Sequence, residues 1–169
     1  MGGAAISDRQ IDALAARVIA RAVQKGLRLA TAESCTGGMI AAALTSVAGS
    51  SAVVEGGIVT YSNAAKVALL GVAEATLATD GAVSEPTARQ MADGVRARTR
   101  ADLAVSVTGI AGPGGGTAQK PVGRVCLGLA SASGPTQTRL RDFGDLGRAG
   151  VRAATVAEAL GWMLDAMAD

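Results

Sequence analysis

The sequence of 169 residues contains no histidine, and this absence removes two kinds of site. Without imidazole there is no Ser-His-Asp or Cys-His catalytic arrangement, and the commonest protein ligand of transition metals is missing. Acid–base chemistry near neutral pH must then come from lysine, tyrosine, cysteine, a carboxylate or the α-amino group.

Aromatic residues are also scarce, at 2% of the chain. Nucleic-acid platforms need aromatic faces and basic stripes. A formal net charge of +2, with arginines scattered along the sequence, offers neither. We therefore expect no nucleic-acid binding as the primary role.

The two cysteines and the lack of long apolar runs indicate the cellular compartment of the protein. Cys35 and Cys126 make neither a disulfide framework nor a zinc-ligand spacing, so we expect both to be reduced and buried. No apolar run is long enough to cross a bilayer, and the N-terminus lacks the pattern of a signal peptide. These features predict a cytoplasmic protein with no membrane contact.

What the sequence does contain is a hydrophobic fraction of 49%, mostly alanine, valine and leucine. This balance favours close-packed helices on a sheet, and we expect one domain over residues 1–169. Helical patterns alternate with strand patterns, and the last two strands follow each other as an antiparallel pair. The predicted fold is an α/β, three-layer α/β/α sandwich around a mixed sheet. The expected helices cover 8–25, 37–47, 64–70, 84–98 and 148–168. The expected strands cover 28–33, 51–61, 102–108, 122–131 and 136–143. Residues 72–82 are expected to hold a polar helical turn and a loop.

The segment Ala32–Gly38 reads as a strand that enters a helix through a tight turn. Such a turn places a small hydroxyl side chain beside unpaired backbone N–H groups, which suits a nucleophile and its oxyanion. Ser34 is the first candidate nucleophile, and its neighbour Cys35 is the second. The simpler alternative is that Ser34 or Thr36 is only a helix N-cap.

Lys66 is the candidate base, because lysine can lose its proton when it is desolvated and arginine cannot. The chain has only three lysines, and Lys66 falls in the first turn of an expected helix that begins at an Asn63 N-cap, where the helix dipole disfavours a cation. A Ser34–Lys66 pair is the simplest nucleophilic arrangement without histidine. Tyr61 lies just before this helix and could relay a proton. The alternatives are a solvated surface lysine and a half-buried strand aromatic.

Three loops follow expected strand ends, at Ser34, at 61–66 and at 108–117, and they would share one sheet edge if those strands are parallel. The last loop is rich in glycine but lacks the Lys-Ser/Thr ending of a phosphate loop for nucleoside triphosphates. Its N–H groups could form an anion-binding nest, or it could be a flexible connector. Lys120, Arg148 and Arg152 are candidate phosphate partners, although each alone is more often a surface charge.

Five motifs in order resemble those of the CinA C-terminal-domain family, the nicotinamide-nucleotide amidohydrolases. They span nearly the whole chain, which makes the resemblance specific: Ala32–Gly38, Val59–Lys66, Gly81–Ser84, Thr108–Gly115 and Lys120–Gly123.

The resemblance implies a bacterial stand-alone domain that hydrolyses the carboxamide of nicotinamide mononucleotide to the acid and ammonia, in pyridine-nucleotide recycling. It implies no metal and no cofactor, and a small pyridine nucleotide as the partner; a homo-oligomer is compatible with it. The family's nucleophile, tyrosine and lysine fall on Ser34, Tyr61 and Lys66. The oxyanion would be held by N–H groups at Thr36, Gly37 and Gly38 or at Thr108 and Gly109, and the phosphate by the glycine-rich loop (Gly112, Gly114, Gly115) with Lys120, Arg148 and Arg152.

The chain departs from the family in one segment before the last helix. The family usually has Gly-Asp-Arg there, whereas this chain has Gly144-Asp145-Leu146-Gly147-Arg148. Arg148 is then the displaced equivalent of the first arginine, and Arg152 matches the second. The competing function is a non-catalytic nucleotide-binding module, or a regulatory module associated with competence or DNA damage.

Overall fold

A mixed five-stranded sheet forms the centre of the protein in the computed structural model, which describes residues 6–168. The strand order is β2-β1-β3-β4-β5, in which β2, β1 and β3 run parallel and β4 and β5 continue antiparallel. The predicted mixed sheet and its antiparallel end are therefore confirmed. The strands are β1 Leu29–Glu33, β2 Val54–Val59, β3 Leu103–Gly109, β4 Arg124–Ser131 and β5 Gly134–Asp142.

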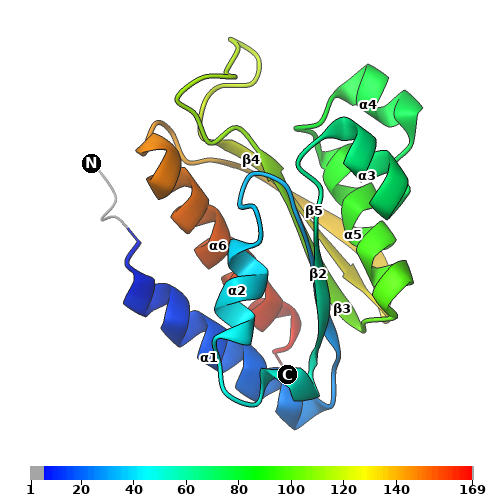
Figure 1. Cartoon of the computed structure of the whole chain (residues 1–169), viewed down its shortest axis with the longest axis vertical. Coiled ribbons are helices and arrows are strands. Elements are labelled where there is room, and N and C mark those ends of the chain that lie inside the picture. Colours follow the sequence, from blue (N-terminus) through cyan, green and yellow to red (C-terminus); the bar gives the residue numbers. More distant parts are fainter. Residues whose placement is uncertain (1–5, 169) are drawn as a thin grey trace.

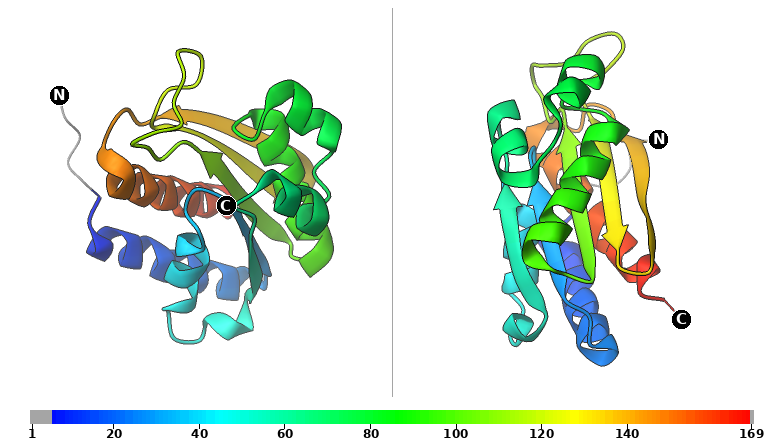
Figure 2. Two further views of the ribbon diagram at one scale, coloured as in Figure 1. Left: turned by 45° about the horizontal axis from the view of Figure 1, so that its top comes forward. Right: turned by 90° about the vertical axis from the view of Figure 1, so that its right-hand side faces the viewer.

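Helices cover both faces of this sheet and complete the three layers (Figure 1). On one face lie α1 (Asp8–Lys25), α2 (Met39–Thr45) and α6 (Gly147–Ala166). On the other lie α3 (Asn63–Leu70), α4 (Glu74–Asp80) and α5 (Glu85–Thr99). Figure 2 shows the same arrangement from two further sides, with the sheet between the two groups of helices. Each face has its own apolar core, and the predicted three-layer fold is confirmed.

Local signals in the sequence set several helix ends where they were expected. Ser7 forms a capping box with Gln10 at the start of α1, and Gly26 ends that helix in the left-handed conformation. Ser84 caps α5, and Pro86 lies in its first turn, where the missing N–H costs little. These ends confirm the predicted boundaries to within one residue. The boundaries could be predicted because a cap depends on neighbouring residues only.

Several predicted boundaries were wrong by a few residues. Ser62, not Asn63, caps α3 by accepting from the N–H of Ala65. The expected long strand 51–61 is shorter, because residues 50–52 form a 3-10 turn before β2. The segment 72–82 contains the two-turn helix α4. Gly134 and Pro135, which fall between the expected strands 122–131 and 136–143, are the first residues of β5, and the turn is at residues 132–133.

Gly57 shows why the β2 sequence has a glycine pair. A Cβ atom at Gly57 would lie 2.6 Å from Thr31 Oγ1 and 2.8 Å from the Ala41 Cβ. The pairing of β1 with β2 also shifts register beside this pair, between Leu29 and Ala30. The glycine pair thus marks both a bulge beside it and a close backbone approach.

Gly94 in α5 allows this helix to lie against α3, and it gives a test of the packing. A Cβ atom at Gly94 would lie 1.9 Å from the backbone oxygen of Leu70. We expect Gly94→Ala to lower the free energy of unfolding by about 3 kcal/mol, because the two helices must move apart. Gly161→Ala in α6 is the matched control, since its Cβ meets open space, and it should gain up to about 1 kcal/mol. Urea unfolding of both variants measures this, and equal stability would contradict the close contact.

Among residues 6–168, no helix combines the length and the apolar character that a bilayer crossing requires.

Candidate active site

The carboxyl ends of β1, β2 and β3 meet at one edge of the sheet because these three strands are parallel. The turn after β1 contains Ser34, the segment after β2 contains Tyr61 and leads to Lys66, and the loop after β3 is the glycine-rich one. The predicted gathering of the three loops is therefore confirmed. Open α/β sheets bind ligands at this edge.

Ser34 and Lys66 meet at this edge in a buried contact. The Lys66 Nζ atom lies 3.0 Å from Ser34 Oγ and donates a second hydrogen bond of 2.9 Å to the Thr60 backbone oxygen. Lys66 is only 1% exposed and Ser34 is 9% exposed. Lys66 is therefore not a solvated surface lysine, and no carboxylate among residues 6–168 is bonded to its amine.

Burial lowers the pKa of the Lys66 amine below its ordinary value of 10.5, because a charged ammonium is poorly solvated there. The amine thus gains the uncharged form that a general base needs. The direction agrees with the prediction, but its main cause is burial beneath the sheet edge rather than position in a helix turn. The partner hydroxyl at 3.0 Å is within the distance for proton transfer.

Cys35 is buried beside Ser34, and its environment keeps it protonated. Burial raises the pKa of the Cys35 thiol to about 11, so a nucleophilic thiolate is scarce at neutral pH. Its side chain belongs to the apolar core between α1, α2, α6 and the sheet. Cys126 is likewise free and buried, as expected. The environment thus favours Ser34 over Cys35 as the nucleophile.

The turn after Ser34 is organised by Glu33, a carboxylate that the sequence did not single out. Glu33 is 1% exposed and accepts hydrogen bonds from Thr36 Oγ1 (2.6 Å) and from the N–H groups of Gly38 (3.1 Å), Ile40 (3.0 Å) and Ala41 (2.8 Å). The cap residue of α2 is Gly38, which has no side chain to donate or accept. The helix-cap alternative for Ser34 and Thr36 was therefore wrong, because Glu33 satisfies the free N–H groups instead.

This arrangement also changes the expected oxyanion site. The Gly38 N–H is bonded to Glu33, and the Gly37 N–H donates to the Ser34 backbone oxygen at 3.0 Å. Neither N–H is available to an oxyanion in this conformation. The Thr36 N–H donates to no acceptor within the described part of the chain. Thr36 is 0% exposed, however, so this N–H group is not accessible to a ligand either.

A pocket of about 220 Å³ opens over the Ser34–Lys66 pair. From the predicted site it includes Ser34, Tyr61, Lys66, Thr108, Gly109 and Arg148, and Cys35 also lines it. The hydroxyl of Thr108 is turned to the Ala82 backbone oxygen, to which it donates at 2.8 Å. Ser34, Lys66 and Arg148, which come from three different segments, therefore share one cavity.

Tyr61 and Arg148 form the outer wall of this pocket. Tyr61 is 60% exposed, and its hydroxyl oxygen accepts a hydrogen bond of 2.6 Å from Arg148 Nη2. Arg148 Nη1 also donates to the Gly112 backbone oxygen at 3.0 Å. Arg148 thus joins the start of α6 to the loops after β2 and β3. Its charge lies at the mouth of the cavity, where an anionic group of a ligand could reach it.

Other predicted binding residues do not line the pocket. Lys120 donates to the Asp80 backbone oxygen, and Arg152 donates to the backbone oxygens of Cys35 and Thr36. Gly112 takes part only through the Arg148 contact. The predicted residues outside the pocket are Thr36, Gly37, Gly38, Gly112, Gly114, Gly115, Lys120 and Arg152.

Four residues that line the pocket were missed: Asn63, Ala82, Val83 and Ala111. Asn63 lies between Tyr61 and Lys66 in the sequence, so its place in the site could have been inferred from its neighbours. Ala82 and Val83 carry no chemical signal. They reach the pocket because the segment before α5 passes over the end of β3, where Thr108 bonds Ala82.

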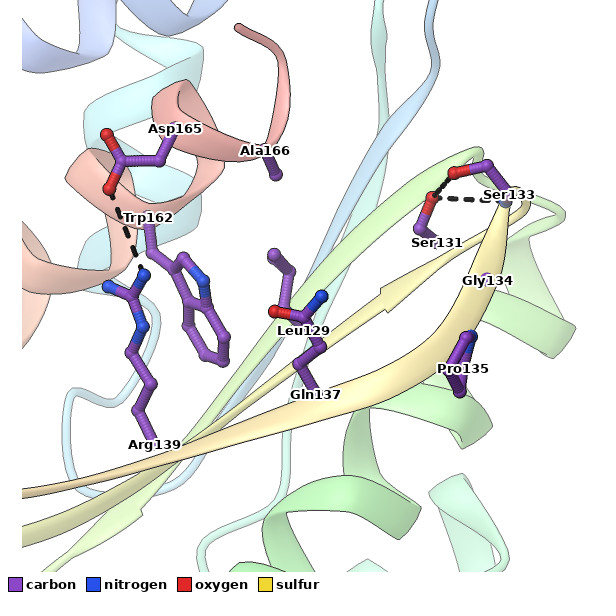
Figure 3. Close-up of a pocket in the computed structure, with 10 residues that line it drawn as sticks. All are labelled: Leu129, Ser131, Ser133, Gly134, Pro135, Gln137, Arg139, Trp162, Asp165 and Ala166. Atoms are coloured by element: carbon purple, nitrogen blue, oxygen red, sulfur yellow. Dashed lines mark hydrogen bonds and ion pairs between the residues drawn. The ribbon is translucent and has the colours of Figure 1, made fainter.

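A larger pocket of about 390 Å³ lies elsewhere, between β4, β5 and the end of α6 (Figure 3). The Arg139 guanidinium stacks 4.3 Å from the centre of the Trp162 ring and lies 3.9 Å from an Asp165 carboxylate oxygen. Trp162 is 3% exposed, so it acts as a packing residue. This pocket shares no residue with the Ser34 cavity and holds no comparable pair of nucleophile and base. Within residues 6–168, no group of three or more histidine, cysteine or acidic side chains could hold a metal ion.

The fold and the site together define an α/β domain with a buried serine–lysine pair at the carboxyl edge of a parallel sheet. The sequence model of the CinA C-terminal domain matches residues 11–167, and the chain belongs to this family. The predicted family is therefore confirmed.

Curated relatives agree with this assignment. A CinA-like protein of Synechococcus sp. (strain CC9902) is 50% identical over 152 residues, which are 90% of this chain and 36% of the relative. A CinA-like protein of Chloroherpeton thalassium is 61% identical over 109 residues, which are 64% of this chain and 26% of the relative. The chain thus spans about a third of the length of the curated relatives it matches.

Solved structures share the fold over nearly their whole length. A competence/damage inducible protein of Agrobacterium tumefaciens has a TM-score of 0.90 and 54% identity, covering 94% of this chain and 95% of that one. The competence damage-inducible protein A of Klebsiella pneumoniae has a TM-score of 0.88 and 38% identity, covering 92% and 95%. These names describe the relatives and assign no reaction.

Proposed function

We propose that this domain hydrolyses the carboxamide of nicotinamide mononucleotide to nicotinate mononucleotide and ammonia. The observation that carries the proposal is the buried contact of 3.0 Å between Ser34 Oγ and an amine whose pKa is lowered. In a chain without histidine, this pair is the arrangement at the sheet edge that can generate an alkoxide-like nucleophile.

In the first half of the reaction, Ser34 Oγ attacks the carboxamide carbon and its proton passes to the uncharged Lys66 nitrogen. The tetrahedral intermediate then collapses to a seryl ester, and the departing nitrogen takes up that proton to leave as ammonia. Tyr61 can relay it, because its oxygen accepts from Arg148 and its own O–H remains available to donate. In the second half, water attacks the ester, Lys66 takes the water proton, and Ser34 regains a proton as nicotinate mononucleotide is released.

The ligand's phosphate is assigned to the mouth of the pocket. Arg148 is the cation that lines this cavity, and it already contacts the glycine-rich loop through Gly112. A phosphate would replace Tyr61 or Gly112 as the acceptor of the Arg148 N–H groups, and a guanidinium suits such a bidentate contact.

The purified domain should release ammonia from nicotinamide mononucleotide, and nicotinamide riboside should be the poorer substrate because it lacks the phosphate. We expect a loss of about tenfold or more in kcat/KM for the riboside, since one charge-assisted contact contributes about 1.5 to 3 kcal/mol. A coupled assay for ammonia measures both. Binding of the nucleotide without any ammonia release would contradict the enzyme and favour the non-catalytic module instead.

A further inference from the structure

The turn that carries Ser34 is held from two sides. On one side Glu33 accepts from the N–H groups of Gly38, Ile40 and Ala41, as described above. On the other side, the carbonyl groups of the turn face α6, where Arg152 Nε donates to the Cys35 oxygen at 3.2 Å and Arg152 Nη2 to the Thr36 oxygen at 3.1 Å. The guanidinium thus holds the two carbonyl groups that follow Ser34, and the carboxylate holds the end of the turn and the start of α2.

Arg148 and Arg152 lie one helical turn apart on α6, but they have different surroundings. Arg148 lines the cavity and bonds the side chain of Tyr61. Arg152 does not line the cavity, and the acceptors of its two bonds are backbone oxygens of the turn. To bind Arg152, a phosphate ligand would have to displace this side chain from both carbonyl groups. Arg148, by contrast, already lines the cavity that the ligand would enter.

The contacts from Arg152 lie directly after the candidate nucleophile in the sequence. The two carbonyl groups that it holds belong to Cys35 and Thr36, one and two residues after Ser34. The Ser34 hydroxyl in turn lies 3.0 Å from the Lys66 amine. A misplacement of about 1 Å in such a contact can cost on the order of 10²-fold in rate. Arg152 is therefore placed to hold the backbone that carries the reacting hydroxyl.

We propose that Arg152 is a positioning residue for the reaction of Ser34, and not a phosphate ligand. It holds the Cys35 and Thr36 carbonyl groups and so fixes the turn from which the Ser34 hydroxyl meets the Lys66 amine. This role rests on the proposed function of the site. Because it concerns the position of the nucleophile and not the binding of the phosphate, it acts on kcat and is independent of the ligand's phosphate.

The test compares Arg152→Gln, Arg152→Lys and Arg148→Gln on nicotinamide mononucleotide and nicotinamide riboside. We expect Arg152→Gln to lower kcat on the order of 10²-fold by the same factor for both substrates, with KM nearly unchanged. Arg152→Lys should recover part of this loss, since its ammonium can reach one of the two carbonyl oxygens. Arg148→Gln should raise KM for the nucleotide and change the riboside reaction less.

Two outcomes would overturn the proposal. If Arg152→Gln raises KM for the nucleotide and spares the riboside, Arg152 binds the phosphate. If kcat stays at the wild-type level while only the melting temperature falls, Arg152 merely stabilises the fold. Arg9→Gln, an exposed residue at the start of α1, is the matched control and should leave all these parameters unchanged.

A second measurement tests the role of Arg152 independently of the proposed hydrolysis of nicotinamide mononucleotide. A fluorophosphonate probe forms a bond from phosphorus to Ser34 Oγ as fluoride leaves and the serine proton passes to Lys66, so its labelling rate reports the same turn without any carboxamide. If the wild-type protein hydrolyses neither substrate, the proposed function fails, yet wild type should still label faster than Arg152→Gln, again on the order of 10²-fold. Equal labelling rates in the two folded proteins would reject the role of Arg152 by itself.

Discussion

Ser34→Ala should abolish ammonia release from nicotinamide mononucleotide, with a loss in kcat of about 10⁵-fold, as for nucleophilic serines that act together with their base. The side chain is buried against Lys66, so removing its oxygen leaves the base without a nucleophile. Nucleotide binding should remain, because Arg148 and the glycine-rich loop are unchanged. Ammonia assays and calorimetric titration measure the two effects.

Ser46→Ala is the matched control for this experiment. Ser46 is exposed at the end of α2, and its hydroxyl donates to the Ala43 backbone oxygen of the same helix. Its variant should keep the wild-type rate. A Ser34→Ala protein with appreciable activity would remove this serine as the nucleophile and bring Cys35 back into consideration.

Lys66→Met should lower kcat by about 10³-fold or more, because the base is lost while the length of the side chain is retained. Lys66→Arg should be nearly as inactive, since a guanidinium keeps the charge but cannot accept a proton. In the wild type, kcat/KM should rise with pH through a pKa below 10.5, the ordinary value for lysine. A rate that falls as the pH rises through this range would contradict an uncharged amine as the base.

The same substitution gives a test of the Lys66 pKa that does not use activity. Between the lowered pKa in the folded protein and 10.5 in the unfolded chain, the unfolded chain binds more protons. The free energy of unfolding of the wild type should therefore rise with pH across this window, relative to Lys66→Met. Urea unfolding from pH 7 to pH 10 measures the difference. A difference that does not change with pH would mean that burial leaves the pKa of Lys66 unshifted.

The secondary structure could be predicted well because its signals are local. The caps at Ser7, Gly26 and Ser84 involve atoms within a few residues of one another, and the helix ends that they set lie within one residue of the predicted ones. The errors arose where distant contacts decide. Gly134 and Pro135 look like turn residues, yet they extend β5 along β4. The helix α4 forms within a segment expected to hold only one turn, and Leu77 packs there against the core beneath α3 and α5.

The candidate site was predicted in its chemistry more than in its geometry. Ser34, Tyr61 and Lys66 could be chosen because the chain has no histidine and very few lysines or tyrosines. The roles of Glu33 and Arg152 could not be foreseen. Glu33 looks like an ordinary strand residue, and Arg152 looks like a second phosphate ligand beside Arg148, until their acceptors and donors are known.

The sequence alone determined the elements, the family and the types of reacting group, because residue composition and short-range patterns encode these. Only the tertiary structure decided that residues 34 and 66 lie 3.0 Å apart, and that the lysine is buried there. That contact joins residues 32 positions apart. It depends on β1 and β2 pairing in parallel, so that both strand ends reach one edge of the sheet, and on α3 packing beneath that edge, where water no longer solvates a charged amine.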